Sequence, residues 1–451
     1  MRPRTSDPTP QSDMFRESLE ALLDPRHELL RLAARIDWDR LDALYGATFV
    51  ERVGRPGLPT RLMLGLHLLK HIKGLSDEAV CAAWVENPYF QAFCGETHFQ
   101  HKLPAERSSM TNWRKRMDPD KLEALLAETI AIAMQSGAIR SRQLERVTLD
   151  TTVQTKAVAH PTDSHLMLRA IEWLNRAARA NGVQLRQSYL RVARHARKEA
   201  ARLMHGRGHK QAKAHLRFMR TRLGRLIRDI ERKIAGDPAR IEALATVLER
   251  ARTIHGQEPG DTRKLYAFHA PEVECIGKGK ARTRYEFGVK ASFATTNERC
   301  KGGQFVLGAM ALPGNPYDGH TLGIQLDQVT RITGTQPARA YLDRGYRGHG
   351  LDRDGLDVHI SYTRGITSPT IRRELGRRNA IEPVIGHLKQ DGLLERNRLK
   401  GTQGDAINAM LCAVGHNLRL LLAWFRTLLW LILAMIICKP KTPSMGTVAQ
   451  N

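Results

Sequence analysis

The chain has 451 residues, with 71 Lys and Arg against 46 Asp and Glu, a formal net charge of +25 and a pI near 10.2. This excess is typical of a nucleic-acid-binding protein, and an anionic membrane surface is the competing partner. The length allows two or three domains, each with its own core. The six cysteines show neither zinc-ligand spacing nor the density of a secreted disulfide scaffold, which indicates a reducing, cytoplasmic protein without structural zinc. They are Cys81, Cys94, Cys275, Cys300, Cys412 and Cys438. We expect the protein to be associated with the nucleoid.

The first part of the chain is predicted to be helical. Residues 1–10 are polar and rich in proline and lack the apolar core of a signal peptide, so we expect a loose tail there. A helix is expected to open at Thr60 and end near Gly74, and Ser76 is expected to cap a second helix that runs to about Asn87. We expect residues 1–140 to form a helical domain for DNA binding or dimerisation.

A short basic helix is predicted after a capping serine, from Ser108 to Arg116. Its cations Arg114, Lys115 and Arg116 favour entry into a DNA major groove, as made by the second helix of a helix-turn-helix. An ordinary surface helix with Trp113 packed inward is an equally good interpretation, because one sequence cannot certify a helix-turn-helix.

A strongly basic helical block interrupts the strands that follow. Strand-like sequence runs from Arg146 to Val158 and ends in a turn. Between His165 and Gly256 there are 22 Lys and Arg against 7 Asp and Glu. These helices either line DNA or form a solvated spacer, and the asymmetry of sign favours DNA. We expect residues 164–261 to be an insertion into one catalytic domain made of residues 141–163 and 262–431.

Strand signals resume after the insertion. Residues 283–293 alternate in polarity, 305–312 form a second apolar run, and a helix starts at Thr321. Strands ending at Leu342 and at Tyr362 follow, and helices complete the chain. The order is three strands, helix, strand, helix, strand and helices, which predicts an α/β fold with an open mixed sheet flanked by helices.

Three acids stand out as candidate metal ligands. Asp150 and Asp343 each follow a short apolar run, which is typical of a buried strand that presents a carboxylate at a sheet end. Helical spacing would put Arg378, Glu382 and Lys389 on one face, with the carboxylate between two cations. Alone, such a stripe is usually a solvated ion pair. Together with the two aspartates it indicates a site of three carboxylates.

Pro383 constrains this helix because it removes a backbone donor. Either Glu382 lies in the first turn with Asn379 as the cap, or it lies on a kink. The first alternative is the one we favour.

Near the C-terminal end, residues 420–438 form an apolar stretch that contains Arg426. Its uninterrupted part, 427–438, is short for a span of about 20 residues. A buried or partner-facing helix is therefore favoured over a membrane span, and residues 432–451 are expected to form a C-terminal tail.

These motifs together resemble the DDE transposases of bacterial insertion sequences, specifically insertion sequence family five, which is related to family four. The resemblance extends from about Pro59 to Leu431. It rests on the residues 149–153, 160–163, 285–290 and 314–320, on Asp343-Arg344-Gly345-Tyr346, and on the spacing of Arg378, Glu382 and Lys389.

The resemblance implies a ribonuclease-H-like fold in which the first and fourth strands lie side by side and a later helix brings the glutamate to them. Asp150, Asp343 and Glu382 would then be the catalytic residues and would hold two Mg²⁺ ions, with Mn²⁺ as a substitute, about 3.5 to 4 Å apart. Hard oxygen ligands suit these ions, and a zinc site would need His or Cys. In family-four relatives the insertion follows the fourth strand, so the role of the present block does not carry over.

The resemblance also implies the DNA contacts. Arg378 and Lys389 would bind phosphates near the cleaved bond, and Tyr346 would either stack on a displaced base or pack. The implied activity is a Mg²⁺-dependent transposase that cuts its terminal inverted repeats and joins them to target DNA. Its partners would be double-stranded DNA and a second copy on the paired end, without a membrane. The alternatives are a ribonuclease-H-like nuclease without strand transfer and a DNA-binding derivative without catalysis, against which the three intact acids argue.

Overall fold

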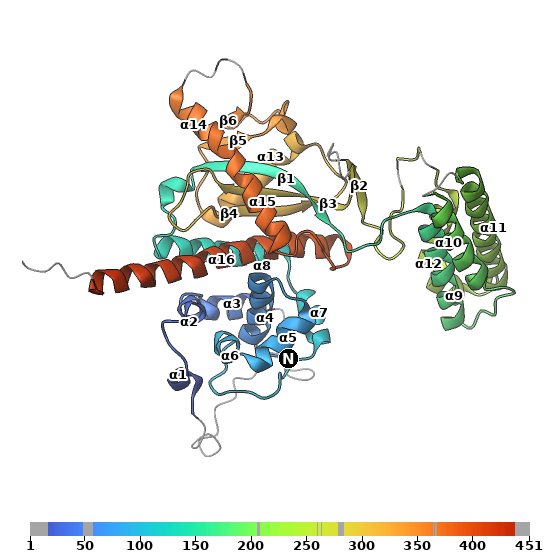
Figure 1. The fold of residues 1–451 in the computed structure, drawn as a ribbon, viewed down its shortest axis with the longest axis horizontal. Helices are drawn as coiled ribbons and strands as arrows, with labels where there is room; N and C mark the ends of the chain where they lie inside the picture. The colour runs from blue at the N-terminus through green and yellow to red at the C-terminus, as the bar shows by residue number, and fades with distance from the viewer. Residues whose placement is uncertain are drawn as a thin grey trace, which may run out of the picture.

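The structure, a computed structural model, describes residues 17–47, 57–204, 208–258, 260–262, 264–277, 284–363, 365 and 368–437. The tail expected at residues 1–10, and residues 438–451 of the tail expected at the other end, lie outside these ranges. Within them the chain is a mixed α/β protein. A helical N-terminal region, a mixed sheet flanked by helices and a separate helical bundle make up the architecture (Figure 1).

The N-terminal region is helical, as predicted. The helix expected from Thr60 ends with Gly74 as its cap, whose φ of 65° is left-handed. The next helix has Ser76 as its N-cap, and the Ser76 side chain accepts from the backbone N–H of Ala79. The short basic helix is capped by Glu106 in a capping box with Ser109, so the expected capping serine was wrong. The helices are α1 (Leu19–Leu22), α2 (Glu28–Ala33), α3 (Trp38–Gly46), α4 (Thr60–Lys73), α5 (Asp77–Glu86), α6 (Pro88–Phe93), α7 (Arg107–Arg114) and α8 (Pro119–Gln135).

A largely buried ion triad joins three of these helices. Asp77, the first residue of α5, accepts from Lys70 of α4 and from Arg114 of α7, each at 2.6 Å. Burial acts to raise the pKa of the Asp77 carboxyl, but the two cations outweigh it and hold that pKa well below its usual range. The triad therefore fixes α7 against α4 and α5.

The sheet has the order β2-β3-β1-β5-β6, and β4 also pairs with β3. The 3-10 turn η1 (Ser141–Gln143) leads into it. The strands of the sheet are β1 (Arg146–Thr155), β2 (Glu274–Gly277), β3 (Tyr285–Thr296), β4 (Val306–Leu312), β5 (Arg339–Leu342) and β6 (Asp357–Ile360). β1 runs antiparallel to β3 and parallel to β5. Strand β2 was not expected, and the helix expected between β5 and β6 is only the 3-10 turn η2 (Arg344–Tyr346).

One long helix, α16 (Gly401–Ile437), lies between the sheet and the N-terminal helices (Figure 1). The Asn417 side chain accepts from the Val306 N–H at 2.9 Å and donates to the Val306 carbonyl at 2.8 Å, and so bonds α16 to β4. Gly415 meets α4 so closely that a Cβ there would lie 2.7 Å from the His71 carbonyl oxygen. The N-terminal helices, α16 and the sheet consequently share one continuous hydrophobic core.

Among the described residues, α16 is the one helix long and apolar enough to cross a membrane, over Gly401–Leu428. About 78% of its apolar window is buried inside the protein. Leu421, Leu422 and Phe425 lie in the shared core. This burial matches the core position expected for the start of the apolar stretch.

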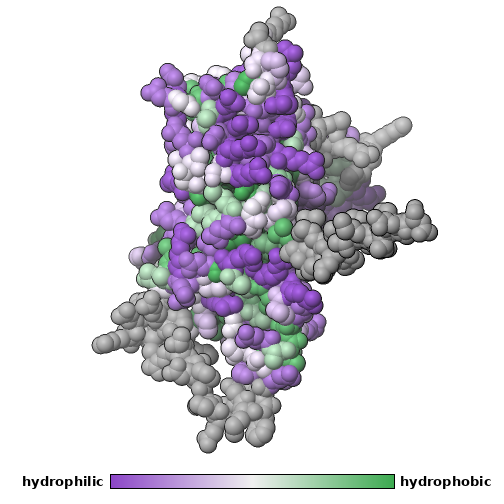
Figure 2. Space-filling model, turned by 90° about the vertical axis from the view of Figure 1, so that its left-hand side faces the viewer, coloured by the Kyte–Doolittle hydropathy of each residue, from purple (hydrophilic) through white to green (hydrophobic). Residues whose placement is uncertain are grey.

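The basic insertion folds as a helical bundle between β1 and β2. Its helices are α9 (Asp163–Ala180), α10 (Leu190–Met204), α11 (His209–Ile234) and α12 (Pro238–Gly256). They enclose a hydrophobic core of their own, and Figure 1 shows the bundle projecting to one side of the sheet. On the opposite side of the molecule, hydrophobic side chains form small groups among hydrophilic ones (Figure 2). The bundle is therefore an appendage with its own core.

Replacing Asp77 by Asn leaves two largely buried cations without a counter-charge, so we expect the free energy of unfolding to fall by about 3 kcal/mol at pH 7. The folded-state pKa is depressed, so the wild-type contribution is present above the ordinary value of 3.8 and is lost as the pH falls below it. Urea unfolding at pH 7 and pH 3 measures both effects. Asp24→Asn, which breaks the exposed pair with Arg26, is the control and should change stability little. Equal losses in the two variants would contradict the role of the triad.

Candidate active site

Of the two aspartates predicted from the strand ends, Asp150 lies on β1 and Asp343 follows directly after the neighbouring strand β5. In the parallel pairing of β1 with β5, Thr148 is opposite Tyr341. Asp150 and Asp343 each lie two residues further along, so both side chains point to the same face of the sheet. Adjacent strands are about 4.8 Å apart. Asp343 also caps η2, where its Oδ1 accepts from the Gly345 N–H at 2.9 Å. The fold thus brings these two acids together from positions nearly 200 residues apart.

The predicted third acid is linked to the first through Arg378. The chain runs from α14 (Pro369–Arg377) through the 3-10 turn η3 (Arg378–Ala380) into α15 (Ile381–Gln390). Arg378 Nη2 lies 3.4 Å from Glu382 Oε1, the ion pair that the spacing predicted. Its Nη1 lies 3.7 Å from Asp150 Oδ2. The Arg378 side chain is 12% exposed and that of Glu382 is 64% exposed, so the arginine is inserted beside the acids while the glutamate faces solvent.

The helix around Pro383 starts as predicted in one respect and not in another. Glu382 does lie in the first turn of α15, where the donor that Pro383 lacks would have had no intrahelical partner. The cap residue is Ala380, without a side-chain cap bond, so Asn379 is not the cap. The side-chain oxygen of Asn379 accepts instead from Arg378 Nη2 at 3.1 Å. Arg378 and Glu382 therefore do not lie on one unbroken α-helix.

Lys389 and Tyr346 occupy positions different from those expected of DNA contacts. Lys389 Nζ lies 3.7 Å from Glu286 Oε2, and its side chain is 16% exposed. Tyr346 is 1% exposed. Burial raises the pKa of its hydroxyl well above the usual range, and the charges of Asp318 and Asp150 add to this. A base contact through Tyr346 does not fit this position, which corresponds to the packing alternative.

A fourth acid, Asp318, lies beside the site without having been singled out from the sequence. It is the first residue of α13 (Asp318–Thr333), and its Oδ1 accepts from Thr151 Oγ1 at 3.2 Å and from Lys290 Nζ at 3.1 Å. A Cβ on Gly345 would lie 3.0 Å from an oxygen of Asp318 and 3.0 Å from one of Asp343. A side chain at this position would require the two carboxylates to move apart.

The acids fit a magnesium ion in part. In the part of the chain that the structure describes, no three His, Cys, Asp or Glu side chains lie close enough together to hold a metal. Arg378 contacts both Asp150 and Glu382, which keeps these two from forming one ligand set with Asp343 in this conformation. Mg²⁺ is usually bound through one or two carboxylates plus water and phosphate oxygens. Asp150 and Asp343 provide this smaller donor set.

The three cations predicted on the basic helix differ in their surroundings. Arg114 is buried in the triad with Asp77, whereas Lys115 and Arg116 follow the end of α7 and are exposed. Trp113 is buried and stacks on Tyr45, which is the inward packing of the alternative interpretation. A major-groove contact through Arg114 does not fit its buried ion pair.

Comparisons with known proteins find a transposase domain and one rhizobial relative. The profile of a transposase domain, DUF772, matches residues 17–116, which contain α1 to α7. Over 197 residues the chain is 52% identical to "Uncharacterized protein ORF8 in nfe locus" of Rhizobium meliloti, covering 44% of this chain and 95% of that protein. The chain carries a transposase domain and belongs to the family of the rhizobial protein. No solved structure matches this transposase-domain protein.

Lys290 and Asp318 should be energetically coupled, because each is less than a quarter exposed and their atoms lie 3.1 Å apart. We expect a double-mutant cycle with Lys290→Met and Asp318→Asn to give a coupling energy of about 1 kcal/mol or more in urea unfolding. The exposed pair of Arg353 and Asp327 serves as the control and should give less. Simple additivity of the Lys290 and Asp318 substitutions would show that the pair does not hold this corner of the site.

Proposed function

We propose that this protein is a DNA transposase that cleaves the terminal inverted repeats of its insertion sequence and transfers the strands to target DNA. The transposase domain at residues 17–116 implies transposase activity. The observation that carries the finer proposal is the position of Asp150 on β1 and of Asp343 directly after its parallel neighbour β5, with Arg378 contacting both Asp150 and Glu382.

The sheet topology supports a ribonuclease-H-like catalytic domain. Strands β1, β3 and β4 are neighbours in the sheet and run antiparallel to one another in turn. Strands β5 and β6 continue the sheet in parallel on the other side of β1. The first acid lies on the central strand, the second at the end of its parallel neighbour, and the third on a helix that follows. This is the arrangement that the sequence resemblance implies for Asp150, Asp343 and Glu382.

Within this proposal each residue has a defined task. Asp150 and Asp343 would hold Mg²⁺, or Mn²⁺ in its place; a bound pair of such ions would activate water or a 3′-hydroxyl and stabilise the leaving oxygen. Arg378 balances the charge of the acids, and its planar guanidinium suits a phosphate that enters beside them. Lys389 would provide a further cation on α15, the helix of Glu382. Lys290 and Asp318 position the start of α13 against the loop of Asp343.

The proposed partners are double-stranded DNA, as element end and as target, and a second copy of the chain on the paired end. The net charge of +25 supports a polyanionic partner, and a nucleoid-associated location in the cytoplasm follows from it. No membrane contact is part of the proposal. A ribonuclease-H-like nuclease would use the same acids, and the match of a transposase domain favours strand transfer over it.

We expect Asp150→Asn to slow Mg²⁺-dependent cutting of a duplex that carries the element end by at least about 100-fold, because it removes a charged oxygen ligand worth about 2.7 kcal/mol of barrier. Asp343→Asn and Glu382→Gln should be impaired in the same assay. Asp327→Asn, an exposed change on α13, is the control. Cutting by Asp150→Asn at the rate of the parent protein would show that the site is assigned wrongly.

Strand transfer separates the two enzymatic alternatives. A duplex with a free 3′-hydroxyl at the element end, incubated with plasmid and Mg²⁺, should become covalently joined to the plasmid. Cut duplex without joined product, under conditions where cutting is complete, would favour the nuclease. Matched inverted repeats and a short direct duplication in the DNA around the gene are expected for the transposase.

A further inference from the structure

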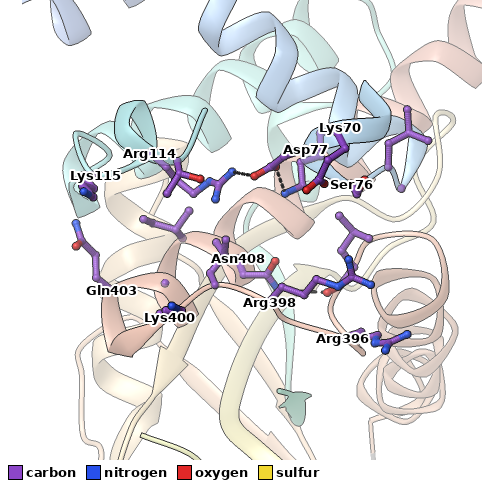
Figure 3. A pocket seen from close by; sticks show the side chains of 18 residues that line it. Lys70, Ser76, Asp77, Arg114, Lys115, Arg396, Arg398, Lys400, Gln403 and Asn408 are labelled. Atoms are coloured by element: carbon purple, nitrogen blue, oxygen red, sulfur yellow. Dashed lines mark hydrogen bonds and ion pairs between the residues drawn. The ribbon is translucent and has the colours of Figure 1, made fainter. Parts of the chain in front are cut away.

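A groove of about 680 Å³ lies between the N-terminal helices and the start of α16 (Figure 3). It is distinct from the acid site in its lining residues. One wall comes from α4, α5 and α7, and the other from the segment before α16 and its first two turns. The labelled side chains are Lys70, Ser76, Asp77, Arg114 and Lys115 on the first wall, and Arg396, Arg398, Lys400, Gln403 and Asn408 on the second.

The second wall carries three cations in regular spacing. Asn397 is bonded to the end of β1 through its backbone. Its N–H donates to the Thr155 carbonyl and its carbonyl accepts from the Ala157 N–H, each at 2.8 Å. Arg396, Arg398 and Lys400 are exposed, and the residues between them are buried or half-buried. Arg396 lies in the turn that precedes residue 397, and Arg398 and Lys400 lie on either side of the half-buried Leu399.

A buried polar network holds this segment in place. Asn397 Nδ2 donates to Asp405 Oδ1 at 2.6 Å, and Lys156 Nζ lies 2.5 Å from the same oxygen and 2.9 Å from Glu272. Burial raises the pKa of Asp405 to about 6, against the opposing effect of Lys156. The three cations are thus presented by a fixed backbone, which lowers the ordering cost of binding an anion.

The groove has more positive charge than its own acids neutralise. On the first wall Lys70 and Arg114 share the carboxylate of Asp77, Glu78 is a second acid, and Lys115 is exposed beside them, so six cations line the groove against two acids. Within the described ranges of the chain, Arg396, Arg398 and Lys400 form no ion pair. A linear polyanion fits a concave space between two cationic walls better than a flat lipid surface fits it.

We propose that this groove binds the sugar-phosphate backbone of one DNA strand through charge, independently of sequence. The inference rests on the proposed function, which supplies DNA as the partner, and it adds the place where the duplex is held. The segment follows α15, which carries Glu382 and Lys389, after five intervening residues. Such contacts position the duplex and carry no base recognition.

The test compares two variants that each remove two positive charges. Arg396→Ala with Arg398→Ala removes the groove cations. Arg299→Ala with Lys301→Ala is the matched control, because these exposed residues also flank a buried one and lie next to Trp424. Trp424 is about 30 Å along α16 from Gln403, at 1.5 Å per residue. The probe is a fluorescently labelled 30-base-pair duplex of arbitrary sequence, with Ca²⁺ in place of Mg²⁺ and anisotropy as the readout.

We expect the groove variant to bind the duplex at least about tenfold more weakly at 0.1 M salt, and the slope of log K against log salt to fall by about 1.8. The control pair should keep the parent slope. Arg396→Lys with Arg398→Lys should restore both values, because a backbone phosphate contact needs charge and not a planar guanidinium. The single change Lys400→Gln should lower the slope by about 0.9 and gives a second measurement if the double variant unfolds.

Equal slopes for the groove and control variants, with both folded by circular dichroism, would overturn the inference. So would a variant that loses binding of polyglutamate and keeps binding of DNA, since the groove would then serve an acidic protein. Neither result depends on cutting. Failure of the Asp150→Asn test with a normal groove result would instead reject the catalytic assignment and leave the DNA groove standing.

Discussion

The structure depends on the close packing of α16 against both α4 and β4. Gly415 permits contact with the backbone of α4, and Asn417 satisfies the backbone N–H and carbonyl of Val306 with one amide. Arg419 adds a bond to the His71 carbonyl at 2.6 Å and one to the Asp391 carbonyl at 3.3 Å. Since Asp391 directly follows α15, one helix connects the transposase domain, the sheet and the helix of Glu382. The N-terminal helices and the end of the helix that carries Glu382 therefore contact the same residue of α16, Arg419.

Most elements of the fold were predictable because their signals are local. Alternating polarity marked β3, apolar runs marked β1, β4 and β5, and Ser76 and Gly74 marked helix ends. Strand β2 has only four residues and gains its place by pairing with β3, which no local pattern reveals. The helix expected after β5 is a 3-10 turn because Gly348, Gly350 and Gly355 adopt positive φ in this stretch.

The candidate site was predictable where it depends on spacing, and not where it depends on tertiary neighbours. Asp150 and Asp343 were found at the ends of apolar runs, and the pair of Arg378 and Glu382 from helical spacing. Asp318 is recognised only by its contact with Lys290 on β3. The buried ion pair of Arg114 could not be predicted locally, because its partner Asp77 is 37 residues away in the chain. A sequence gives the charge of a side chain and leaves the identity of its partner to the fold.

The insertion of the bundle also determines when the sheet can assemble. β1 pairs with β3, which begins about 130 residues later. At a synthesis rate of about 5 to 20 residues per second, β1 waits roughly 7 to 26 s on the ribosome before its antiparallel partner exists. The bundle needs only its own local contacts and completes its core in that interval. Nascent chains therefore pass through a stage in which the bundle is folded while the strand that bears Asp150 is still unpaired.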